Sequence, residues 1–321
     1  MGEGRIRLGI VGSGRIATRF APELACVDGI EAVCVYNPHV QSAQAYAKAC
    51  GIAVVAKSFE QLLEECDAVY VASPHETHFG YARASLEAGR HVLCEKPLAL
   101  SGDEAAELYE LAERSGCVLV EAVKTAFCPG YRKLVEVVRS GVIGEVCDVE
   151  SCFTRLTPRG CRERDDVRFG GSLLELGSYA FLPIVQLLGC DFEDVRFESI
   201  ADADGIDVFT KVSVRYPNAL ALAKVGLGVK SEGQLIVSGT EGYVLAQAPW
   251  WLTERFEVHR EDPDVVDVYE AEYAGEGLRY EIAAFVDAIA GAGDCAAFLK
   301  PEESIAAAKV VERFLQQRNQ A

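Results

Sequence analysis

The spacing of hydrophobic positions changes once along the chain, close to residue 121. Before this point, short apolar runs alternate with segments in which apolar residues recur every three or four positions. This alternation is typical of strands joined by helices in a doubly wound parallel sheet. The predicted strands are 5–11, 30–36, 53–56, 68–72, 91–94 and 117–121, and the predicted helices are 15–25, 41–50, 59–65, 77–88 and 103–115.

Residues beside two of these helices support their limits. Ser101 followed by Glu104 has the spacing of a capping box at the start of a helix. Gly89 and Gly116 stand where helices commonly end, because glycine readily adopts the left-handed conformation required there.

After residue 121 the pattern becomes one of strand after strand, which favours an open, mostly antiparallel sheet. We therefore predict an α/β protein of two domains, 1–123 and 124–321, whose C-terminal helices can pack back on the first domain. The elements predicted for the second domain are helices 131–140, 173–188, 278–289 and 302–317 and strands 146–154, 194–200, 208–216, 219–227, 234–238, 242–246, 254–259 and 265–271.

Composition narrows the possible partners and compartment. A length of 321 residues suits two domains, and a formal charge of −18 argues against nucleic acid or an anionic membrane as a partner. No apolar run approaches the roughly 20 residues needed to span a bilayer, and the first residues lead directly into a strand, so we expect no signal peptide and a cytoplasmic protein.

The twelve cysteines are scattered and form no Cys-x-x-Cys pair, so we predict reduced thiols and no metal site. Free cysteine is among the residue types most often buried. The cysteines that lie within apolar patterns, and are expected in the interior, include Cys34, Cys94, Cys117 and Cys147.

A glycine-rich turn follows the first predicted strand and precedes the first helix. Gly12 permits a tight turn, Gly14 allows a pyrophosphate to approach the backbone, and Ala17 lets helix and strand pack closely. The free N–H groups of the helix start favour phosphate. We therefore predict a dinucleotide site that includes Gly12, Ser13, Gly14, Arg15 and Ile16.

The end of the second strand reads Tyr36-Asn37-Pro38-His39, where an NAD site usually has Asp or Glu for the ribose diol. Without a carboxylate, a 2′-phosphate is not repelled, and Arg15 or His39 can approach it. We therefore predict an NAD(P) cofactor with a slight preference for NADP. The alternative is that Asn37 bonds the ribose of either cofactor and the protein uses both.

The segment Glu95-Lys96-Pro97 ends the fifth predicted strand, at the sheet edge where doubly wound folds bind ligands. Moving a hydride to or from an alcohol carbon requires a group that handles the hydroxyl proton. Lys96 is suitably placed for this, Glu95 can pair with it, and Pro97 restricts the backbone. The alternative is a solvated surface ion pair.

In the second domain, Glu175 and Tyr179 lie one helical turn apart on the same face. A nearby Lys96 ammonium would favour the phenolate form of Tyr179. The tyrosine could then give or take a proton while the lysine binds the substrate oxygen. The alternative is a half-buried tyrosine with a purely structural hydroxyl group.

The segment after the fourth strand, Ser73 to His78, borders the nicotinamide side of such folds. Ser73, Pro74 and His78 are candidates for cofactor contact, and His75 is a candidate for substrate contact. The alternative is that His75 and His78 lie at the start of a helix without contacting any ligand. Further candidates for the substrate side are Lys124, Arg155 and Thr157.

Taken together, these motifs resemble the glucose–fructose oxidoreductase and inositol dehydrogenase family (Gfo/Idh/MocA) over nearly the whole chain. The resemblance implies a Rossmann domain, an α/β substrate domain with a large open sheet, and a homodimer or homotetramer built on that sheet. The motifs that carry it are Gly12-x-Gly14-Arg15-Ile16-Ala17, Cys94-Glu95-Lys96-Pro97, Gly141-x-Ile143-Gly144-Glu145 and Gly170-Gly171-Ser172-Leu173-Leu174-Glu175-Leu176-Gly177.

One departure from the family pattern concerns the second-domain helix. Many sugar and polyol dehydrogenases of the family carry Asp-x-x-x-His there, whereas this chain has Glu175-x-x-x-Tyr179. Tyrosine at that place looks like the glucose–fructose oxidoreductase and dimeric dihydrodiol dehydrogenase branch, in which it is taken as the acid/base. The resemblance therefore favours Tyr179 as the catalytic acid/base and leaves the role of Glu175 open.

These observations predict an NAD(P)-dependent dehydrogenase or reductase acting on a sugar, polyol or related hydroxyl or carbonyl compound. Lys96 and Tyr179 are expected to handle the substrate oxygen and its proton. One alternative is a sensor that binds a dinucleotide or a sugar without catalysis, and another is an enzyme that keeps its cofactor tightly bound. Substrate identity cannot be read from motif spacing, because specificity depends on the geometry of the site.

Overall fold

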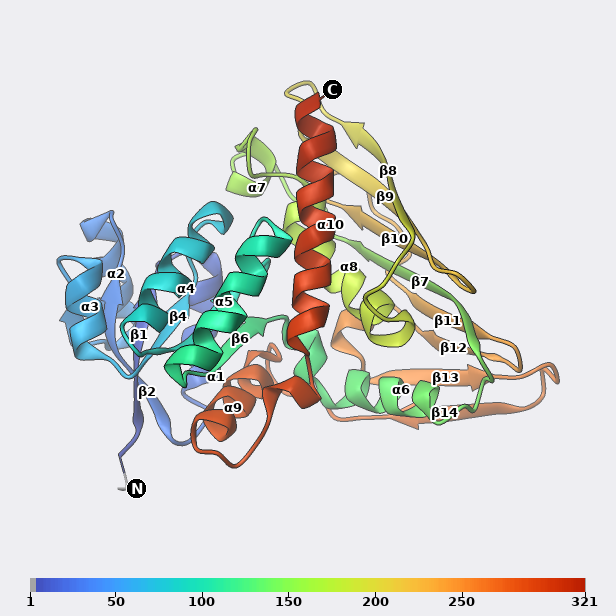
Figure 1. The fold of residues 1–321 in the computed structure, drawn as a ribbon, viewed down its shortest axis with the longest axis horizontal. Helices are drawn as coiled ribbons and strands as arrows, with labels where there is room; N and C mark the ends of the chain where they lie inside the picture. The colour runs from blue at the N-terminus through green and yellow to red at the C-terminus, as the bar shows by residue number, and fades with distance from the viewer. Residues whose placement is uncertain (1–3, 321) are drawn as a thin grey trace. The chain divides into compact units, whose positions relative to one another are not determined.

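The computed structural model describes residues 4–320, and the chain forms two compact units (Figure 1). Unit 1 combines the residues up to Lys124 with Ala274–Ser304, and unit 2 combines Thr125–Tyr273 with the residues from Ile305 onward. The first unit thus includes a C-terminal segment that is distant in sequence.

Unit 1 is built on a six-stranded sheet of order β3-β2-β1-β4-β5-β6, in which every neighbouring pair is parallel. The chain reverses its direction of winding between β1 and β4, which is where such sheets bind ligands, outside the carboxyl ends of the strands. This confirms the predicted doubly wound parallel sheet. The strands are β1 (Ile6–Val11), β2 (Ile30–Tyr36), β3 (Val54–Val55), β4 (Ala68–Val71), β5 (His91–Glu95) and β6 (Leu119–Ala122).

The helices of unit 1 begin and end close to the predicted limits. Ser101 accepts a 3.2 Å hydrogen bond from Glu104 N, but the Glu104 carboxylate accepts from Leu100 N, one residue earlier than a standard capping box. Gly116 ends its helix with a φ of 64°. The helices are α1 (Arg15–Leu24), α2 (Val40–Cys50), α3 (Phe59–Glu65), η1 (His75–Thr77), α4 (His78–Glu87), α5 (Gly102–Ser115), α9 (Leu278–Ile289) and η4 (Cys295–Ala297).

Unit 2 contains an eight-stranded sheet of order β14-β13-β12-β11-β7-β10-β9-β8. All neighbouring pairs are antiparallel except β7 with β10, which confirms the predicted open, mostly antiparallel sheet. The strands are β7 (Val146–Thr154), β8 (Asp194–Ala201), β9 (Asp207–Arg215), β10 (Leu220–Gly226), β11 (Leu235–Gly239), β12 (Tyr243–Ala246), β13 (Arg255–His259) and β14 (Val266–Glu270).

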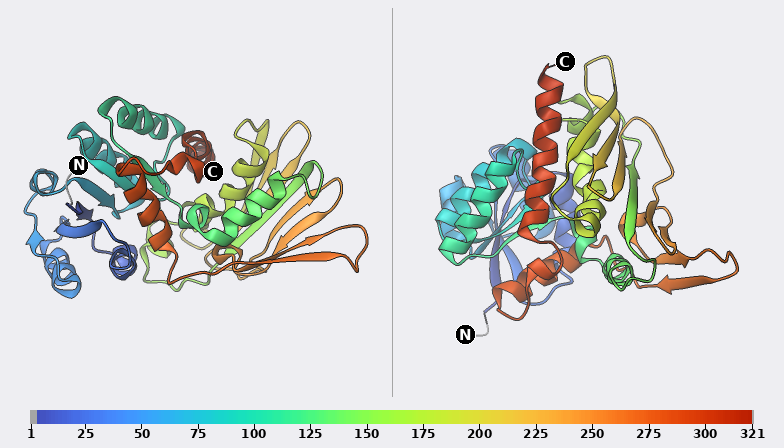
Figure 2. Two further views of the ribbon diagram at one scale, coloured as in Figure 1. Left: turned by 90° about the horizontal axis from the view of Figure 1, so that it is seen from below. Right: turned by 45° about the vertical axis from the view of Figure 1, so that its right-hand side comes forward.

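One face of this sheet packs on α8, which contacts β7, β9 and β10 (Figure 2). The alternation along β10 places Ala221 and Ala223 in the core and Leu220 on the opposite face. In the part of unit 2 that the structure describes, no helix covers that opposite face (Figure 2). The helices are η2 (Lys124–Phe127), α6 (Pro129–Arg139), α7 (Arg162–Asp165), α8 (Ser172–Leu188), η3 (Trp250–Leu252) and α10 (Pro301–Gln320).

None of the twelve cysteines, all of which lie within residues 4–320, forms a disulfide. Cys34 and Cys94 are buried as predicted, but Cys117 is half-buried and Cys147 is exposed. The expectation for Cys147 was wrong because the residue lies at an irregularity in the pairing of β7 with β11, where Asp148 pairs with Ser238 and Val146 with Gly239. The strand alternation that buries Val149 therefore does not extend to it.

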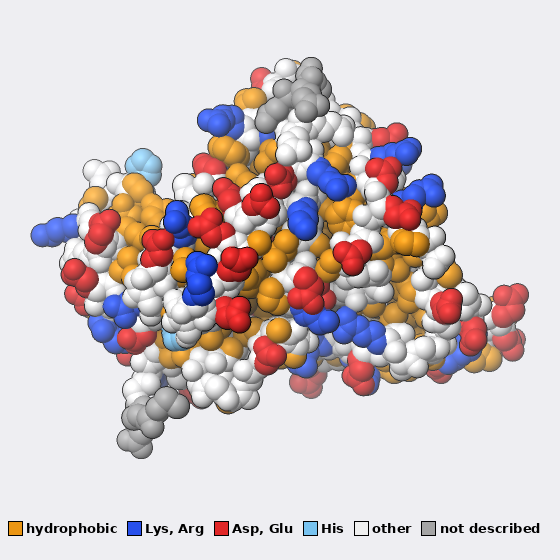
Figure 3. Space-filling model, viewed as in Figure 1, with side chains coloured by type: hydrophobic (Ala, Val, Ile, Leu, Met, Phe, Trp, Pro, Cys, Tyr) orange, Lys and Arg blue, Asp and Glu red, His pale blue; other side chains and the backbone are white. Residues whose placement is uncertain are grey.

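Charged groups are spread over the face of the molecule drawn in Figure 3. On the face drawn in Figure 3, acidic and basic side chains are interspersed, so the negative net charge is not gathered there into one acidic patch. Among residues 4–320, no helix has both the length and the apolar character needed to cross a membrane.

Candidate functional site

The glycine turn joins β1 to α1, and its backbone leaves room for a ligand. Gly12 has a φ of 101°, and a Cβ there would lie 2.3 Å from the carbonyl oxygen of Ala72, so only glycine fits. A Cβ on Gly14 would meet nothing within 4 Å. Gly14 is also the N-cap of α1 and makes no side-chain cap, so open space adjoins the helix start. These residues therefore fit the pyrophosphate of a dinucleotide.

The end of β2 is tied to this turn by Asn37. Its Nδ2 donates a 2.8 Å hydrogen bond to Ser13 Oγ, and its Oδ1 accepts a 2.8 Å bond from His39 N. Arg15 and His39 are exposed. The amide of Asn37 thus occupies the place where an NAD site usually has a carboxylate. His39 is two residues further along the chain, and Arg15 is two residues after Ser13, the hydrogen-bond partner of Asn37.

His78 is completely buried at the start of α4. Its Nδ1 lies 2.8 Å from Pro97 O and its Nε2 lies 2.9 Å from Ser73 O, so both ring nitrogens meet backbone carbonyls. Burial lowers the pKa of His78, while the two carbonyl groups act in the opposite direction. The ring therefore links the loop after β4 to the loop after β5.

The other residues of this loop are more accessible. Ser73 is half-buried and its hydroxyl lies 2.7 Å from Thr77 Oγ1, and Pro74 is exposed. His75 is half-buried, with its ring 5.6 Å from that of His78. Ser73, Pro74 and His75 therefore remain candidates for ligand contact.

Glu95 is the last residue of β5 and Lys96 follows it, and both are buried, with exposed fractions of 5% and 8%. The hydroxyl of Tyr70 in β4 donates a 2.7 Å hydrogen bond to Glu95 Oε1. This burial does not suit the alternative of a solvated surface pair. Because β1, β4 and β5 are parallel, Lys96 follows its strand at the same edge of the sheet as the glycine turn.

Two further titratable side chains of unit 1, Lys124 and Glu281, are buried. The amine of Lys124 donates to the backbone carbonyl of Glu276. Glu281 of α9 is fully buried, and neither of its carboxyl oxygens has a hydrogen-bond partner among the described residues. Burial, and next the charge of Glu95, raise the pKa of Glu281. Sequence reasoning named Lys124 but missed Glu281, which lies in a distant amphipathic helix pattern.

In unit 2, Glu175 on α8 belongs to an ion-pair group. Arg155 Nη2 lies 3.3 Å from Glu175 Oε1 and 3.4 Å from Glu163 Oε1, and its Nε donates to Thr157 Oγ1 at 3.4 Å. The two carboxylates are mostly shielded, whereas the Arg155 side chain is 38% exposed. Arg155 and Glu175, two predicted site residues, are thus brought together, and Glu175 is engaged in orienting a cation.

Tyr179 is half-buried one turn further along α8, between buried neighbours on either side. Its ring lies 5.3 Å from Phe153, which stacks on Trp251 at 3.7 Å. The aromatic row fixes the plane of the phenol while part of the side chain stays accessible. Glu175 and Tyr179 share the accessible stripe of the helix, as their spacing predicts.

The start of α8 is held by Asp207, a residue that sequence reasoning missed. Asp207 Oδ2 accepts a 2.9 Å hydrogen bond from Leu173 N and a 3.0 Å bond from Thr210 Oγ1. Arg318 Nη1 lies 3.9 Å from Asp207 Oδ1. Burial raises the pKa of Asp207 to about 6. The only sequence signal is an aspartate at the start of an apolar strand, which does not reveal a helix 35 residues away.

Comparison with known proteins identifies the class to which this fold and these residues belong. Residues 6–123 match the oxidoreductase family with an NAD-binding Rossmann fold, and residues 131–245 match the C-terminal domain of the same family. The chain therefore belongs to the Gfo/Idh/MocA family, as the motifs predict.

Similar proteins include an uncharacterized oxidoreductase of Rhizobium meliloti, 32% identical over 66% of this chain and 65% of that protein. A scyllo-inositol 2-dehydrogenase (NADP(+)) of Bacillus subtilis is 30% identical over 63% of this chain and 64% of that protein. The matched part of the chain thus spans less than two thirds of the length of these relatives.

Among solved structures, a 3-ketoreductase from Actinomadura kijaniata in complex with TDP-benzene and NADP is 24% identical, with a TM-score of 0.82. The match covers 96% of both chains. At this level of identity the likeness shows that the fold is shared.

Proposed function

We propose that this protein is an NADP-preferring oxidoreductase that interconverts a hydroxyl and a carbonyl group on a sugar, polyol or related compound. The observation that carries the proposal is the buried Lys96, which follows β5 at the same sheet edge as the open turn at Gly14. A buried amine beside a proposed dinucleotide site suits a role in catalysis better than the role of an ordinary surface lysine, which keeps its amine in solvent.

The residues around the glycine turn would hold the cofactor, with the pyrophosphate at Gly12 to Ile16 and the adenosine ribose beside Asn37. When bound, the nicotinamide supplies hydride acceptance and donation. The amide at position 37 favours NADP because it does not repel a 2′-phosphate. Names of relatives support this preference, since the Bacillus subtilis dehydrogenase is described with NADP(+) and the ketoreductase was crystallised with NADP.

The chain's own residues divide the remaining work. We propose that during oxidation the phenolate form of Tyr179 accepts the hydroxyl proton as the carbon loses its hydride, and that the resulting phenol returns the proton during reduction. The Lys96 ammonium donates a hydrogen bond to the same substrate oxygen, which stabilises negative charge that develops on it. Arg155, oriented by Glu175, is suited to bind a further oxygen of a hydroxylated substrate.

The test measures formation of reduced cofactor from NADP and from NAD with a panel of inositols, hexoses and pentoses. Lys96→Ala and Tyr179→Phe should each lower kcat by at least about 100-fold, the usual size of a lost proton-transfer or oxyanion-stabilising group. Lys133→Ala and Tyr243→Phe, which alter exposed residues, serve as matched controls.

Unchanged turnover in both site variants would refute the assigned roles. Cofactor binding without any redox change across the panel would instead favour a sensor that binds dinucleotide. A nicotinamide absorbance in the purified protein would indicate a tightly held cofactor.

We further propose a homodimer or homotetramer that uses the uncovered face of the unit 2 sheet. Large apolar side chains on that face are exposed, including Ile200 at 57%, Leu220 at 55% and Val268 at 49%. The register places all three on the face opposite α8. Apolar residues gathered on one sheet face are typical of an interface. Cysteines that form no disulfide among the described residues suit a reducing compartment, and we propose the cytoplasm.

A further inference from the structure

The backbone that follows Lys96 is held by side chains from two other elements of unit 1. On one side, His78 of α4 contacts Pro97 O at 2.8 Å. On the other side, Leu98 N donates a 3.0 Å hydrogen bond to Glu121 Oε1. Glu121 comes from β6, the neighbour of β5 in the sheet. The segment from Lys96 to Leu98 is therefore held at two places, each by a titratable side chain.

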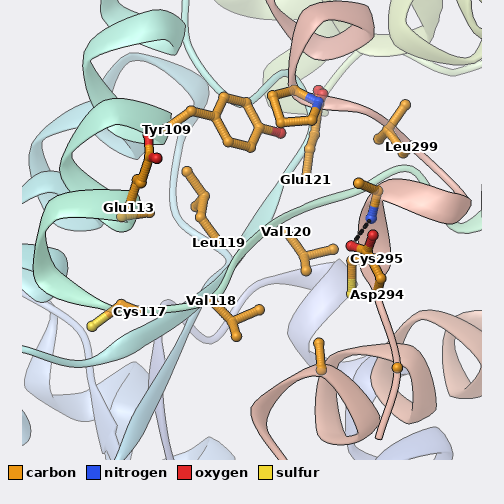
Figure 4. Close-up of a pocket in the computed structure, with 15 residues that line it drawn as sticks. Tyr109, Glu113, Cys117, Val118, Leu119, Val120, Glu121, Asp294, Cys295 and Leu299 are labelled. Atoms are coloured by element: carbon orange, nitrogen blue, oxygen red, sulfur yellow. Dashed lines mark hydrogen bonds between the residues drawn. The ribbon is translucent and has the colours of Figure 1, made fainter. Parts of the chain in front are cut away.

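Glu121 is an unusual residue at its position, because it is only 3% exposed within an otherwise apolar strand. It lines a pocket of ≈ 330 Å³ bounded by α5, β6 and residues 293–301. In Figure 4 the ring of Tyr109 extends from α5 toward the Glu121 side of this pocket, opposite Leu299. Glu121 is therefore a buried residue that borders a cavity.

We propose that Glu121 is a positioning residue for Lys96, and that gain or loss of its proton changes how firmly the Lys96 segment is held. The inference rests on the proposed function, because it concerns the lysine assigned there to the substrate oxygen. It goes beyond that function by assigning a role to a side chain on the opposite side of β5 from the Tyr70 contact.

The physical basis is the strength of the bond to Leu98. An ionised carboxylate accepts a hydrogen bond about twice as strong as a neutral acceptor does. The ionised form also attracts the Lys96 ammonium, and this attraction opposes the effect of burial on Glu121. Protonation weakens both interactions at once, so the segment is held less firmly at low pH.

The groups around Glu121 place the gain or loss of its proton near neutral pH. Burial raises the pKa of Glu121 to about 7, against the lowering effects of Ser304, the Leu98 N–H and Lys96. The titratable groups that act on Glu121 are Tyr109 from α5, Cys94 and Glu95 from β5, and Lys96, which follows β5. The other titratable residues that line the same pocket are Glu113 of α5, Cys117, Asp294 and Cys295 of η4.

The experiment follows the amide proton of Leu98 by NMR in the full chain labelled with 15N-leucine, from about pH 5 to about pH 9. Leu98→Val identifies the resonance. In the wild type, the resonance should shift with a midpoint near 7. Glu121→Gln keeps an oxygen acceptor but cannot ionise, so its Leu98 resonance should not respond to pH in this range. Glu113→Gln alters an exposed carboxyl of the same pocket and should retain the wild-type response.

A kinetic measurement then uses the inositol or sugar of the panel that is turned over. The wild-type kcat should rise about fivefold between pH 6 and pH 8, the gain expected from one charge-assisted bond. Glu121→Gln should match the wild type at pH 6 and stay about fivefold lower at pH 8. Glu121→Asp, which ionises but is one methylene too short to reach Leu98 N, should also lack the full rise.

The outcomes separate this inference from the proposed function. A Leu98 resonance that does not titrate in the wild type overturns the inference, and so does a titrating resonance with identical kcat profiles in wild type and Glu121→Gln. If no panel compound is turned over, the proposed function fails, and the NMR titration alone supports or overturns the coupling between Glu121 and the Lys96 segment.

Discussion

The carboxylate of Asp207 caps α8 by accepting a 2.9 Å hydrogen bond from Leu173 N. The same carboxylate fills the space beside Gly171, where a Cβ would lie 1.9 Å from Asp207 Oδ1. Ser172 Oγ adds a 2.9 Å bond to the backbone carbonyl of Asp207. The helix that carries Glu175 and Tyr179 therefore starts from a contact between two segments distant in sequence.

Gly171→Ala should destabilise the protein by about 3 kcal/mol or more, because it combines a clash with a backbone conformation at φ 115° that side chains rarely adopt. Gly160→Ala is the matched control, since Gly160 has a φ of 93° but open space around its Cβ position, and about 1–2 kcal/mol is expected. Urea unfolding monitored by circular dichroism compares the two. Equal losses would mean that the Asp207 contact contributes nothing.

Tyr70→Phe removes the 2.7 Å bond to Glu95 while keeping the ring that stacks on Phe20. We expect a loss of about 1.5–3 kcal/mol, the usual contribution of a hydrogen bond to a charged group, together with a lower kcat. Tyr46→Phe removes a buried bond to Ala17 O and is the control. It should lower stability by about 1 kcal/mol without changing kcat. A kcat reduced equally in both variants would contradict a link between Tyr70 and the Lys96 region.

Asn37→Asp places a carboxylate where an NAD site usually has one. The new charge should repel a 2′-phosphate, so the Kd for NADPH should rise at least about tenfold while that for NADH stays equal or falls. Binding is followed by the fluorescence of the reduced cofactors. Asn37→Ala, which removes the bond to Ser13 without adding charge, separates repulsion from loss of turn geometry. A parallel loss for both cofactors would count against an NADP-selective site.

The stability of the wild type should fall as pH rises from about 5 to about 8, relative to Glu121→Gln. The pKa of Glu121 in the folded chain, about 7, lies above its ordinary value of 4.5. Between these pH values the native state therefore retains a proton that the unfolded state has lost. The resulting decrease in the free energy of unfolding grows to about 3 kcal/mol above pH 7. Urea midpoints at the two pH values measure it, with Glu113→Gln as control. A constant difference between wild type and variant would exclude the shift.

Leu220→Asp should disrupt an oligomer built on the uncovered sheet face, because a carboxylate there would be buried without a partner. Light scattering after size-exclusion chromatography measures the mass, and the variant should be monomeric at concentrations where the wild type is not. Val167→Asp changes an equally exposed apolar residue away from the sheet and should not alter the mass. A monomeric wild type would refute the proposed assembly.

Most elements were predictable because their signals are local. The strand patterns at 30–36 and 146–154 and the helix pattern at 278–289 agree with the observed limits, since periodicity and end residues act within a few positions. The short elements η3 and α7 were missed because they have too few residues to show a period. Cys147 was misplaced because it lies at an irregularity in the pairing of β7 with β11, which the spacing of apolar residues does not reveal.

By itself, the sequence determined the two-part organisation of sheets, the glycine turn and the family, because each depends on residue order and on backbone preferences over short spans. Only the tertiary structure decided that both ring nitrogens of His78 contact backbone carbonyl groups and that Asp207 caps a distant helix. It also decided that Glu121 meets the segment after Lys96. Burial and hydrogen bonding between remote segments set the charge state and accessibility of a side chain, and neither has a period that can be read along the chain.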